Sequence, residues 1–282
     1  MKLEGKAAII TGGSGAIGSS AAKHLLRDGA AVLLMGRRAD ALEETRTRLL
    51  AEIPKGRVEC HPGDACIEAD VEAAIKHAYS MLGRLDILVA TVGGGNGFVP
   101  LMMLDADAFR GQFERNVVST FMAVRHAVPL MEPGGAIVCI SSNAGKLPFA
   151  YLSAYHTAKG GLENFVRAAA EELGSAGIRI NAVRPGLTRT SRTGYLWEAE
   201  TLAKFVAEYP LGRAGEPDDI GAAVRFLAGP ESSWMTGQSF AADGGQELRK
   251  NPDLSVEVAR NLGQAALDAA RRGKPNDSKQ RQ

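Results

Sequence analysis

The sequence predicts an α/β fold, with a doubly wound parallel sheet of about seven strands and helices on both faces. Three observations predict it. Short apolar runs alternate with segments of helical periodicity along most of the chain. The runs are apolar at consecutive positions, as in Ile-Val-Cys-Ile at 137–140, which is typical of strands buried on both faces. A glycine-rich turn follows the first run, so the fold is interpreted as a single Rossmann-type domain.

The elements follow in order from this alternation. Apolar runs predict strands at 7–11, 31–35, 57–60, 85–90, 136–140, 178–183 and 239–241. Segments with helical spacing lie at 17–27, 41–52, 67–82, 108–131, 154–173 and 218–227. Three of the helices are followed by a glycine that suits a left-handed C-terminal cap, namely Gly29, Gly83 and Gly174.

Residues 188–213 interrupt the alternation between the sixth strand and the last helix. They are rich in aromatic and aliphatic side chains, among which Tyr195, Trp197 and Phe205 are the largest candidates for contact with an apolar ligand. These side chains suggest a lid that closes on something apolar. The alternative is that these side chains pack against the body or against a neighbouring subunit, because an apolar stripe at helical spacing is usually core.

Composition excludes several classes of protein. The chain of 282 residues carries 33 Lys and Arg against 32 Asp and Glu and is 45% apolar, so neither disorder nor binding of nucleic acid by bulk charge is expected. No leader peptide and no run of ~18 apolar residues is found, so we expect a cytoplasmic protein without membrane partners. Cys60, Cys66 and Cys139 form no metal-binding pattern, and no metal site is expected.

The first turn predicts a dinucleotide site. It reads Thr-Gly-Gly-Ser-Gly-Ala-Ile-Gly at 11–18, with the Gly-x-Gly-x-x-Gly spacing at Gly13, Gly15 and Gly18. Glycines there allow a tight turn and close approach of backbone amides to a pyrophosphate, and the helix N-terminus favours negative charge. The motif is weak by itself, but its place between the first strand and the first helix makes it specific.

The end of the second predicted strand favours NADP(H) over NAD(H). An acidic residue there would bind the ribose 2′-hydroxyl of NAD and repel a 2′-phosphate, but Met35 is followed by Gly36, Arg37 and Arg38. Guanidinium groups can bind a phosphate through charge-assisted hydrogen bonds. The alternative is that both arginines are solvated loop charges.

A candidate acid/base pair opens the fifth helical segment. Tyr155 and Lys159 are four residues apart and therefore share a helix face. A phenol with a pKa of ~10 is a poor proton donor or acceptor at neutral pH, and a neighbouring ammonium is expected to lower that pKa. Ser142 lies at the end of the fifth strand, where ligands bind in such sheets, and Asn116 lies in the helix that precedes this strand. His156, one position after Tyr155, points about 100° away and is assigned a packing or surface role.

From Lys6 to Gly245 the sequence resembles the short-chain dehydrogenase/reductase family, in particular members like 3-oxoacyl-ACP reductase. The landmarks occur in the family's order: the turn at 11–18, Asp64, the run 86–89 leading to Gly93, Asn116, Ser142, Tyr155, Lys159, the segment 179–186 with Thr190, and Thr236-Gly237 followed by Asp243-Gly244-Gly245. Two positions depart from the pattern. Ala16 replaces a glycine, and Ala-Thr-Val-Gly at 90–93 replaces the usual Asn-Asn-Ala-Gly.

The resemblance implies a catalytic tetrad of Asn116, Ser142, Tyr155 and Lys159. By this analogy Tyr155 is the general acid toward a carbonyl, Ser142 hydrogen-bonds the same oxygen, Lys159 holds the ribose hydroxyls and lowers the pKa of Tyr155, and Asn116 supports a water relay. The cofactor would contact Gly12, Ser14, Gly15, Ile17, Gly18, Arg37, Arg38, Asp64, Ala65, Thr91, Gly93, Tyr155, Lys159, Pro185, Gly186, Leu187 and Thr190.

The expected activity is reduction of a ketone with NADPH, on a 3-oxoacyl thioester or a bulky alicyclic substrate. No lid cation among Arg189, Arg192 and Lys204 can be assigned to a phosphopantetheine or CoA. An NAD-dependent secondary-alcohol dehydrogenase is the alternative enzyme, and a cofactor-binding regulator without catalysis is the alternative of another class. The resemblance also implies a homotetramer or homodimer built on the helices that contain Asn116 and Tyr155.

The last 37 residues, 246–282, are expected to be an extension of the enzyme body 1–245, which includes the lid. They hold eight basic and five acidic side chains, so they are more basic than the body. Leu254 and the apolar residues that follow it at four-residue spacing predict a helix over about 254–270, and disorder is expected from Arg271. The helix would dock on a neighbouring subunit or flank the mouth of the active site; a solvated tail is the alternative.

Overall fold

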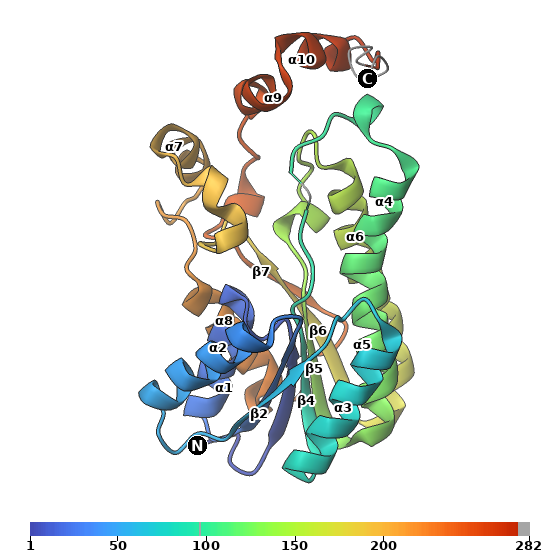
Figure 1. Ribbon diagram of the computed structural model, residues 1–282, viewed down its shortest axis with the longest axis vertical. Coiled ribbons are helices and arrows are strands. Elements are labelled where there is room, and N and C mark those ends of the chain that lie inside the picture. The colour runs from blue at the N-terminus through green and yellow to red at the C-terminus, as the bar shows by residue number, and fades with distance from the viewer. Residues whose placement is uncertain (96, 276–282) are drawn as a thin grey trace.

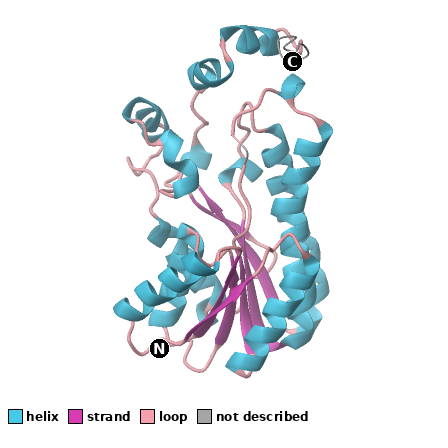
Figure 2. Ribbon diagram, in the orientation of Figure 1, coloured by secondary structure: helices cyan, strands magenta, loops and turns pink. Residues whose placement is uncertain are grey.

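The computed structural model describes residues 1–95 and 97–275. Its centre is one parallel sheet of seven strands in the order β3-β2-β1-β4-β5-β6-β7 (Figure 2). The strands are β1 Ala7–Thr11, β2 Ala31–Gly36, β3 Val58–Pro62, β4 Leu85–Ala90, β5 Met131–Ile140, β6 Arg179–Pro185 and β7 Ser239–Ala242. The predicted fold class is confirmed. The order changes direction between β1 and β4, and ligands bind at such a switch point, beyond the carboxyl ends of the strands.

Helices cover both faces of this sheet (Figure 1). One face carries α1 Ala16–Arg27, α2 Ala39–Glu52 and α8 Pro217–Ala228, and the other carries α3 Glu68–Leu82, α4 Ala106–Phe113, α5 Ser119–Ala127 and α6 Ser153–Leu173. Neighbouring residues of a strand serve opposite faces. Ile9 packs with the core on the α3, α5 and α6 side, whereas Ile10 packs with the core on the α1, α2 and α8 side. Both faces are therefore dry, which explains the uninterrupted apolar runs.

The helix expected over 108–131 contains a π turn at Glu114–Val118, through which α4 runs on into α5 with helical backbone angles. It ends earlier than expected, because β5 already begins at Met131. The expected cap at Gly174 is also wrong. Gly174 has a helical φ of −58° and the chain continues through a 3-10 turn to Gly177, whose φ of 69° ends it. Gly29 and Gly83 have the expected positive φ.

The lid and the chain end lie beyond the carboxyl ends of the strands. The lid contains a 3-10 helix, Ser191–Leu196, and α7, Ala199–Ala207. After a short turn at Gln246–Leu248, the single helix expected over about 254–270 is two helices, α9 Ser255–Leu262 and α10 Gln264–Arg271, because the chain bends at Gly263 with φ 88°. Figure 1 shows them above the body, between α7 and the end of α4.

The disorder expected from Arg271 falls mostly on 276–282, outside the described residues; Arg271 itself ends α10. Within the part of the chain that the structure describes, no helix is both long and apolar enough to cross a bilayer.

Candidate active site

A cavity of about 910 Å³ lies at the carboxyl ends of the strands. It is large enough for a dinucleotide and a second small molecule together. It gathers nearly all the residues that the sequence singled out: Gly12, Ser14, Gly15, Ile17, Gly18, Arg37, Asp64, Ala65, Thr91, Gly93, Ser142, Tyr155, Lys159, Pro185, Gly186, Leu187 and Thr190. Arg38 and Asn116 are not among the residues that line it.

The glycine turn presents backbone amides to this cavity. Helix α1 starts at Ala16 without a side-chain cap and without an acidic residue in its first turn, and Gly15, Ala16 and Ile17 line the cavity. Its first N–H groups therefore remain available to an anion. The turn is tied to the loop after β4, because the Thr91 hydroxyl donates to the Thr11 carbonyl at 2.6 Å. Thr91 thus makes a direct bond between β4 and the turn at one of the positions where this chain departs from the family's pattern.

The cofactor end of the cavity is cationic. Arg37 lines it, as do Arg115 and Arg192, and among the described lining residues the single acid is Asp64. Burial and the positive charges of Arg115 and Arg37 lower the pKa of Arg192, which shows that the three guanidinium groups lie within electrostatic range of one another. This donor set suits the phosphates of a nicotinamide dinucleotide. Arg115 and Arg192 were not assigned from the sequence, because nothing in their local pattern distinguishes them from solvated charges.

Tyr155 and Lys159 lie on the cavity wall as their spacing predicts. Both come from the first turns of α6, with the Lys159 ammonium 5.8 Å from the centre of the Tyr155 ring. Lys159 is 2% exposed and donates to the Ile140 carbonyl at 2.8 Å. Burial lowers the pKa of Lys159 to about 8. A lysine with a lowered pKa beside a half-buried tyrosine is a candidate proton-handling pair.

The pKa of Tyr155 differs from the expectation. The sequence predicted a value lowered by Lys159, but burial raises it, and the groups that oppose this rise are the hydrogen bond with Ser142 and the charge of Arg192. The expectation was wrong in direction because spacing along a helix carries no information about desolvation. The structure places Ser142 against the Tyr155 hydroxyl, and the Ser142 oxygen also accepts from the Ala144 amide at 3.2 Å.

Asn116 does not line the cavity but binds Gly94, which does. It is fully buried in the π turn between α4 and α5, a geometry that often marks functional sites. Its Oδ1 accepts from the Gly94 amide at 2.8 Å, and its Nδ2 donates to the Gln112 carbonyl at 2.9 Å. A Cβ added to Gly93 would lie 2.7 Å from Asn116 Oδ1 and 2.9 Å from Lys159 Nζ, so the absence of a Cβ at Gly93 lets both side chains approach the backbone there.

The opposite end of the cavity is apolar. Its lining includes Phe98, Phe149, Leu187, Leu196 and Phe205, which form one packed cluster under the lid. Tyr195 also lines the cavity, in edge-on contact with Phe98, and is 55% exposed. This end therefore suits an apolar ligand.

The remaining large lid residues are held by other contacts. The Trp197 ring is stacked under the Arg189 guanidinium at 3.9 Å and is not among the lining residues. Arg189 also pairs with Glu216, and Lys204 pairs with Glu257. Arg192 is therefore the one of the three lid cations that lines the cavity in the described structure.

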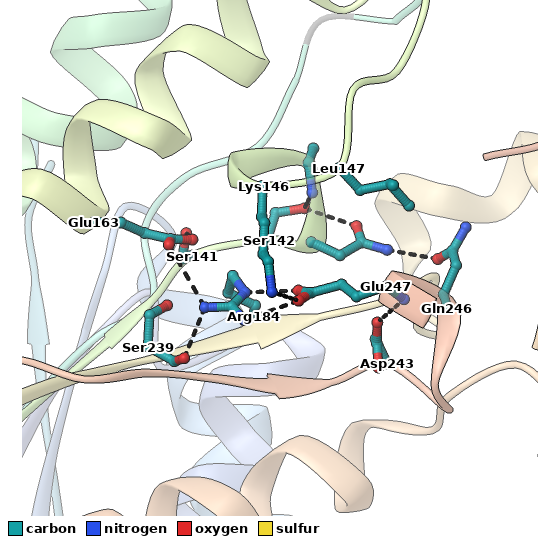
Figure 3. Close-up of polar contacts among 12 residues, drawn as sticks. Ser141, Ser142, Lys146, Leu147, Glu163, Arg184, Ser239, Asp243, Gln246 and Glu247 are labelled. Carbon is teal, nitrogen blue, oxygen red and sulfur yellow. Dashed lines mark hydrogen bonds and ion pairs between the residues drawn. The ribbon is translucent and has the colours of Figure 1, made fainter. Parts of the chain in front are cut away.

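A buried polar network lies beside Ser142 (Figure 3). Arg184 on β6 makes two bonds to Glu247, at 2.6 and 2.9 Å, and one to the Ser239 carbonyl at 2.7 Å. Glu163 on α6 lies 3.6 Å from Arg184 and accepts from the Ser141 hydroxyl at 2.9 Å. The network joins α6, β6, β7 and the chain end next to the Ser142 turn. The sequence did not reveal it, because its members lie up to 106 positions apart.

Of the cysteines, Cys66 lines the cavity, whereas Cys139 does not. Cys139 is fully buried, and burial raises the pKa of its thiol to about 12. His156 does not line the cavity. No cluster of three or more potential metal ligands occurs among the described residues.

Comparison with known proteins gives consistent relatives. A family model described as enoyl-(acyl carrier protein) reductase matches residues 12–247. The chain is 35% identical over 254 residues to a 7alpha-hydroxysteroid dehydrogenase of Escherichia coli strain K12, covering 88% of this chain and 97% of the relative. It is 34% identical over 242 residues to a cis-4-hydroxycyclohexanecarboxylate dehydrogenase of Sinomonas cyclohexanicum, covering 85% and 96% respectively.

Two solved structures are similar throughout. A short-chain type dehydrogenase/reductase from Mycobacterium ulcerans has a TM-score of 0.90 at 31% identity, covering 95% of this chain and 99% of its own. A 7alpha-hydroxysteroid dehydrogenase in complex with NADH and 7-oxo glycochenodeoxycholic acid has a TM-score of 0.82 at 33% identity, covering 90% and 97%. The first match covers so much of this chain that it must reach into the segment after Gly245.

Proposed function

The chain belongs to the short-chain dehydrogenase/reductase family of oxidoreductases, and we propose that it reduces a bulky, apolar or alicyclic ketone with NADPH, or oxidises the corresponding secondary alcohol. One observation carries the proposal. Tyr155, hydrogen-bonded to Ser142, lies on the wall of one cavity whose cofactor end is cationic and whose far end is apolar. A carbonyl held against these two hydroxyls would lie between a phosphate-binding region and an apolar pocket.

The proposed mechanism assigns each polar side chain one task. A bound nicotinamide would supply the hydride. The Ser142 hydroxyl hydrogen-bonds the substrate oxygen, and Tyr155 donates its proton to the same oxygen. Lys159 would hold the ribose hydroxyls of the bound cofactor, and Asn116, which accepts from the Gly94 amide, would support a proton relay. A Tyr155→Phe variant should therefore lose turnover while it still binds cofactor, and unchanged turnover would show that Tyr155 is not the acid. Cofactor binding without any turnover in the unaltered protein would favour the alternative of a non-catalytic regulator.

Arg37 supports the choice of NADP(H). It follows the second strand, at the position where an NAD-binding protein would carry an acid, and it lines the cavity. NAD(H) is the second candidate, because the similar 7alpha-hydroxysteroid dehydrogenase structure contains NADH. Fluorescence titration with both cofactors separates them: Arg37→Ala should weaken NADPH binding and leave NADH binding unchanged. Tighter binding of NADH by the unaltered protein would exclude the 2′-phosphate argument.

The apolar end favours a ring system over an acyl thioester. Arg189 and Lys204 are engaged by Glu216 and Glu257, which leaves few lid cations for a phosphopantetheine or CoA. The relatives' names also refer to hydroxysteroid and cyclohexane substrates. A panel of alicyclic alcohols, alicyclic ketones and 3-oxoacyl thioesters, assayed with both cofactors, tests this choice.

Assembly as a homotetramer or homodimer, in the cytoplasm, remains a prediction. Phe121 on α5 is 43% exposed and contacts Phe165 on α6 edge-on, so an aromatic patch lies on the outer face of the helices expected to pair. Of the alanines on α6 that would allow close approach of a second helix, Ala168 is exposed, whereas Ala169 and Ala170 pack against the sheet. Light scattering of the purified protein measures the state directly.

A further inference from the structure

The segment after Gly245 is fixed at its start to the turn that carries Ser142. Gln246 is fully buried and accepts a hydrogen bond from the Asn143 side chain, next to Ser142. Glu247 is held by Arg184 in the buried network of Figure 3. The start of the extension is therefore part of the floor beneath the candidate active site.

The next residues of the segment run along the cavity. Gln246 donates to Asn251 at 2.8 Å, and Asn251 donates to the Pro148 carbonyl at 2.9 Å. Both Gln246 and Asn251 line the cavity. Further along, the Ser255 and Tyr151 hydroxyls lie 3.3 Å apart. These bonds attach the segment to the loop 147–151 on one side of the opening.

Leu254 fills the space behind the apolar wall. It is 2% exposed and belongs to the same packed cluster as Leu187, Leu196 and Phe205, all three of which line the cavity. A leucine buried in this way excludes water from the back of the substrate end. Without it, the lid would face solvent there.

Glu257 attaches the segment to the lid on the other side. Its Oε1 accepts from the Thr201 hydroxyl at 3.1 Å and from the Lys204 ammonium at 2.8 Å, and both donors are on α7. Glu257 is 8% exposed, so water screens these bonds little. A second bond between the extension and the lid, Arg260 to Glu198 at 2.7 Å, has side chains 51% and 59% exposed and should contribute little.

We propose that residues 246–258 form a strap that completes the outer wall of the substrate end, and that Glu257 is a positioning residue that keeps α7 closed on it. The strap limits the size of the substrate by holding Phe205 in the wall. This inference rests on the proposed function for the substrate class, whereas the attachment of α7 can be measured without any substrate. It also assigns the extension to its own subunit's cavity rather than to a solvated tail.

The test compares Glu257→Ala, which removes two buried bonds from α9 to α7, with Arg260→Ala as the control, which removes one exposed bond from α9 to Glu198 next to α7. Hydrogen exchange of the α7 amides, 199–207, should become about tenfold faster in Glu257→Ala and stay unchanged in Arg260→Ala. Glu257→Gln keeps a group that can accept from Thr201 and should give an intermediate rate, which guards against a variant that fails to fold. Unchanged exchange of the α7 amides in Glu257→Ala would contradict the proposal that Glu257 keeps α7 closed.

Kinetics with an alicyclic alcohol test the second part of the proposal, that the strap limits the size of the substrate. In Glu257→Ala the KM should rise about tenfold with kcat within about twofold and an unchanged Kd for the cofactor, since the reacting groups are not touched. Leu254→Ala should improve kcat/KM for larger rings relative to smaller ones. Faster exchange with an unchanged KM would overturn the size-limiting role. Absence of turnover in the unaltered protein would reject the proposed function, while the exchange experiment would still decide the strap.

Discussion

The buried Lys159 ammonium destabilises the folded protein. Its side chain is 2% exposed, and burial lowers its pKa from 10.5 to about 8. Between these two pH values the unfolded chain binds a proton that the folded chain does not, so stability rises with pH across this window and the full cost applies below it. At about 1.4 kcal/mol for each pH unit, the cost is about 3 kcal/mol at pH 7.

Lys159→Met should therefore stabilise the protein while abolishing activity. Removing the buried charge stabilises the fold, and the loss of the hydrogen bond to the Ile140 carbonyl offsets part of this gain. We therefore expect a free energy of unfolding about 1–3 kcal/mol higher at pH 7. The advantage should shrink as the pH rises from 8 to 10.5. Urea unfolding of both proteins at pH 7 and pH 10 measures it, and an equal difference at the two pH values would contradict the burial argument.

Arg192 should set the pH at which the enzyme oxidises an alcohol. The positive charge of Arg192 opposes the rise that burial causes in the pKa of Tyr155. Alcohol oxidation needs the phenolate as base, so the rate increases as the pH passes through that pKa. Arg192→Leu raises the pKa further and should move the rising limb of the kcat profile to higher pH, with slower oxidation at neutral pH.

The control for this experiment is Arg189→Leu. Arg189 is three positions away in the same lid, is held on Trp197 and by Glu216, and does not line the cavity. Its substitution should leave the pH profile in place. Equal shifts in both variants would indicate a general effect of lid charge rather than the contact of Arg192 with the site.

At the scale of single residues, most residues of the cavity wall could be predicted from the sequence, whereas the pKa shift of Tyr155 could not. Ser142, Tyr155 and Lys159 could be predicted because two of them have a fixed helical spacing and the third ends a strand. The direction of the pKa shift of Tyr155 could not, because burial depends on α6, the lid and β5 together. Arg192 was missed for the same reason: its position over Gly94 results from the path of the lid.

Helix ends are the least predictable part of the elements, and α6 offers a direct test. Gly174 has a helical φ of −58° and open space where a Cβ would lie, so Gly174→Ala should raise the free energy of unfolding by about 0.4–1 kcal/mol. Gly177 has φ 69°, and a Cβ there would lie 3.2 Å from Pro133 Cβ. Gly177→Ala should destabilise the protein by about 1 kcal/mol or more.

Denaturant unfolding of this pair identifies which glycine ends the helix. The opposite order of stabilities would restore Gly174 as the left-handed cap.

Elements buried on both sides were easier to predict, because an apolar run of five residues has few alternatives in this fold. The π turn was not predictable, since residues 114–118 are equally compatible with a regular α-helix. The turn is explained only by the contacts of Asn116 with Gly94 and Gln112.

At the scale of the whole molecule, the chain end is integrated with the sheet rather than added to it. The separation of 1–245 from 246–282 on composition remains a prediction about domains, but the contacts of Gln246 and Glu247 lie inside the body. Composition could indicate that the segment is different. It could not indicate where the segment packs, because Lys204, the partner of Glu257, lies 53 positions earlier in the chain and Pro148, a partner of Asn251, lies 103 positions earlier.

Arg184 on β6 pairs with Glu163 on α6 and with Glu247 in the chain end, so its removal should destabilise the entire fold. Arg184, Glu163 and Glu247 have side chains only 8–9% exposed, so Arg184→Met leaves two buried carboxylates without their main counter-charge. We expect a free energy of unfolding about 3–5 kcal/mol lower. Adding Glu247→Leu should restore part of the loss, because one uncompensated charge is then removed as well. Arg110→Ala breaks a pair whose side chains are 73% and 93% exposed and should change stability by less than about 0.5 kcal/mol. Urea unfolding of the four proteins decides the matter: a double variant as unstable as Arg184→Met would mean that packing, not charge, makes Arg184 necessary.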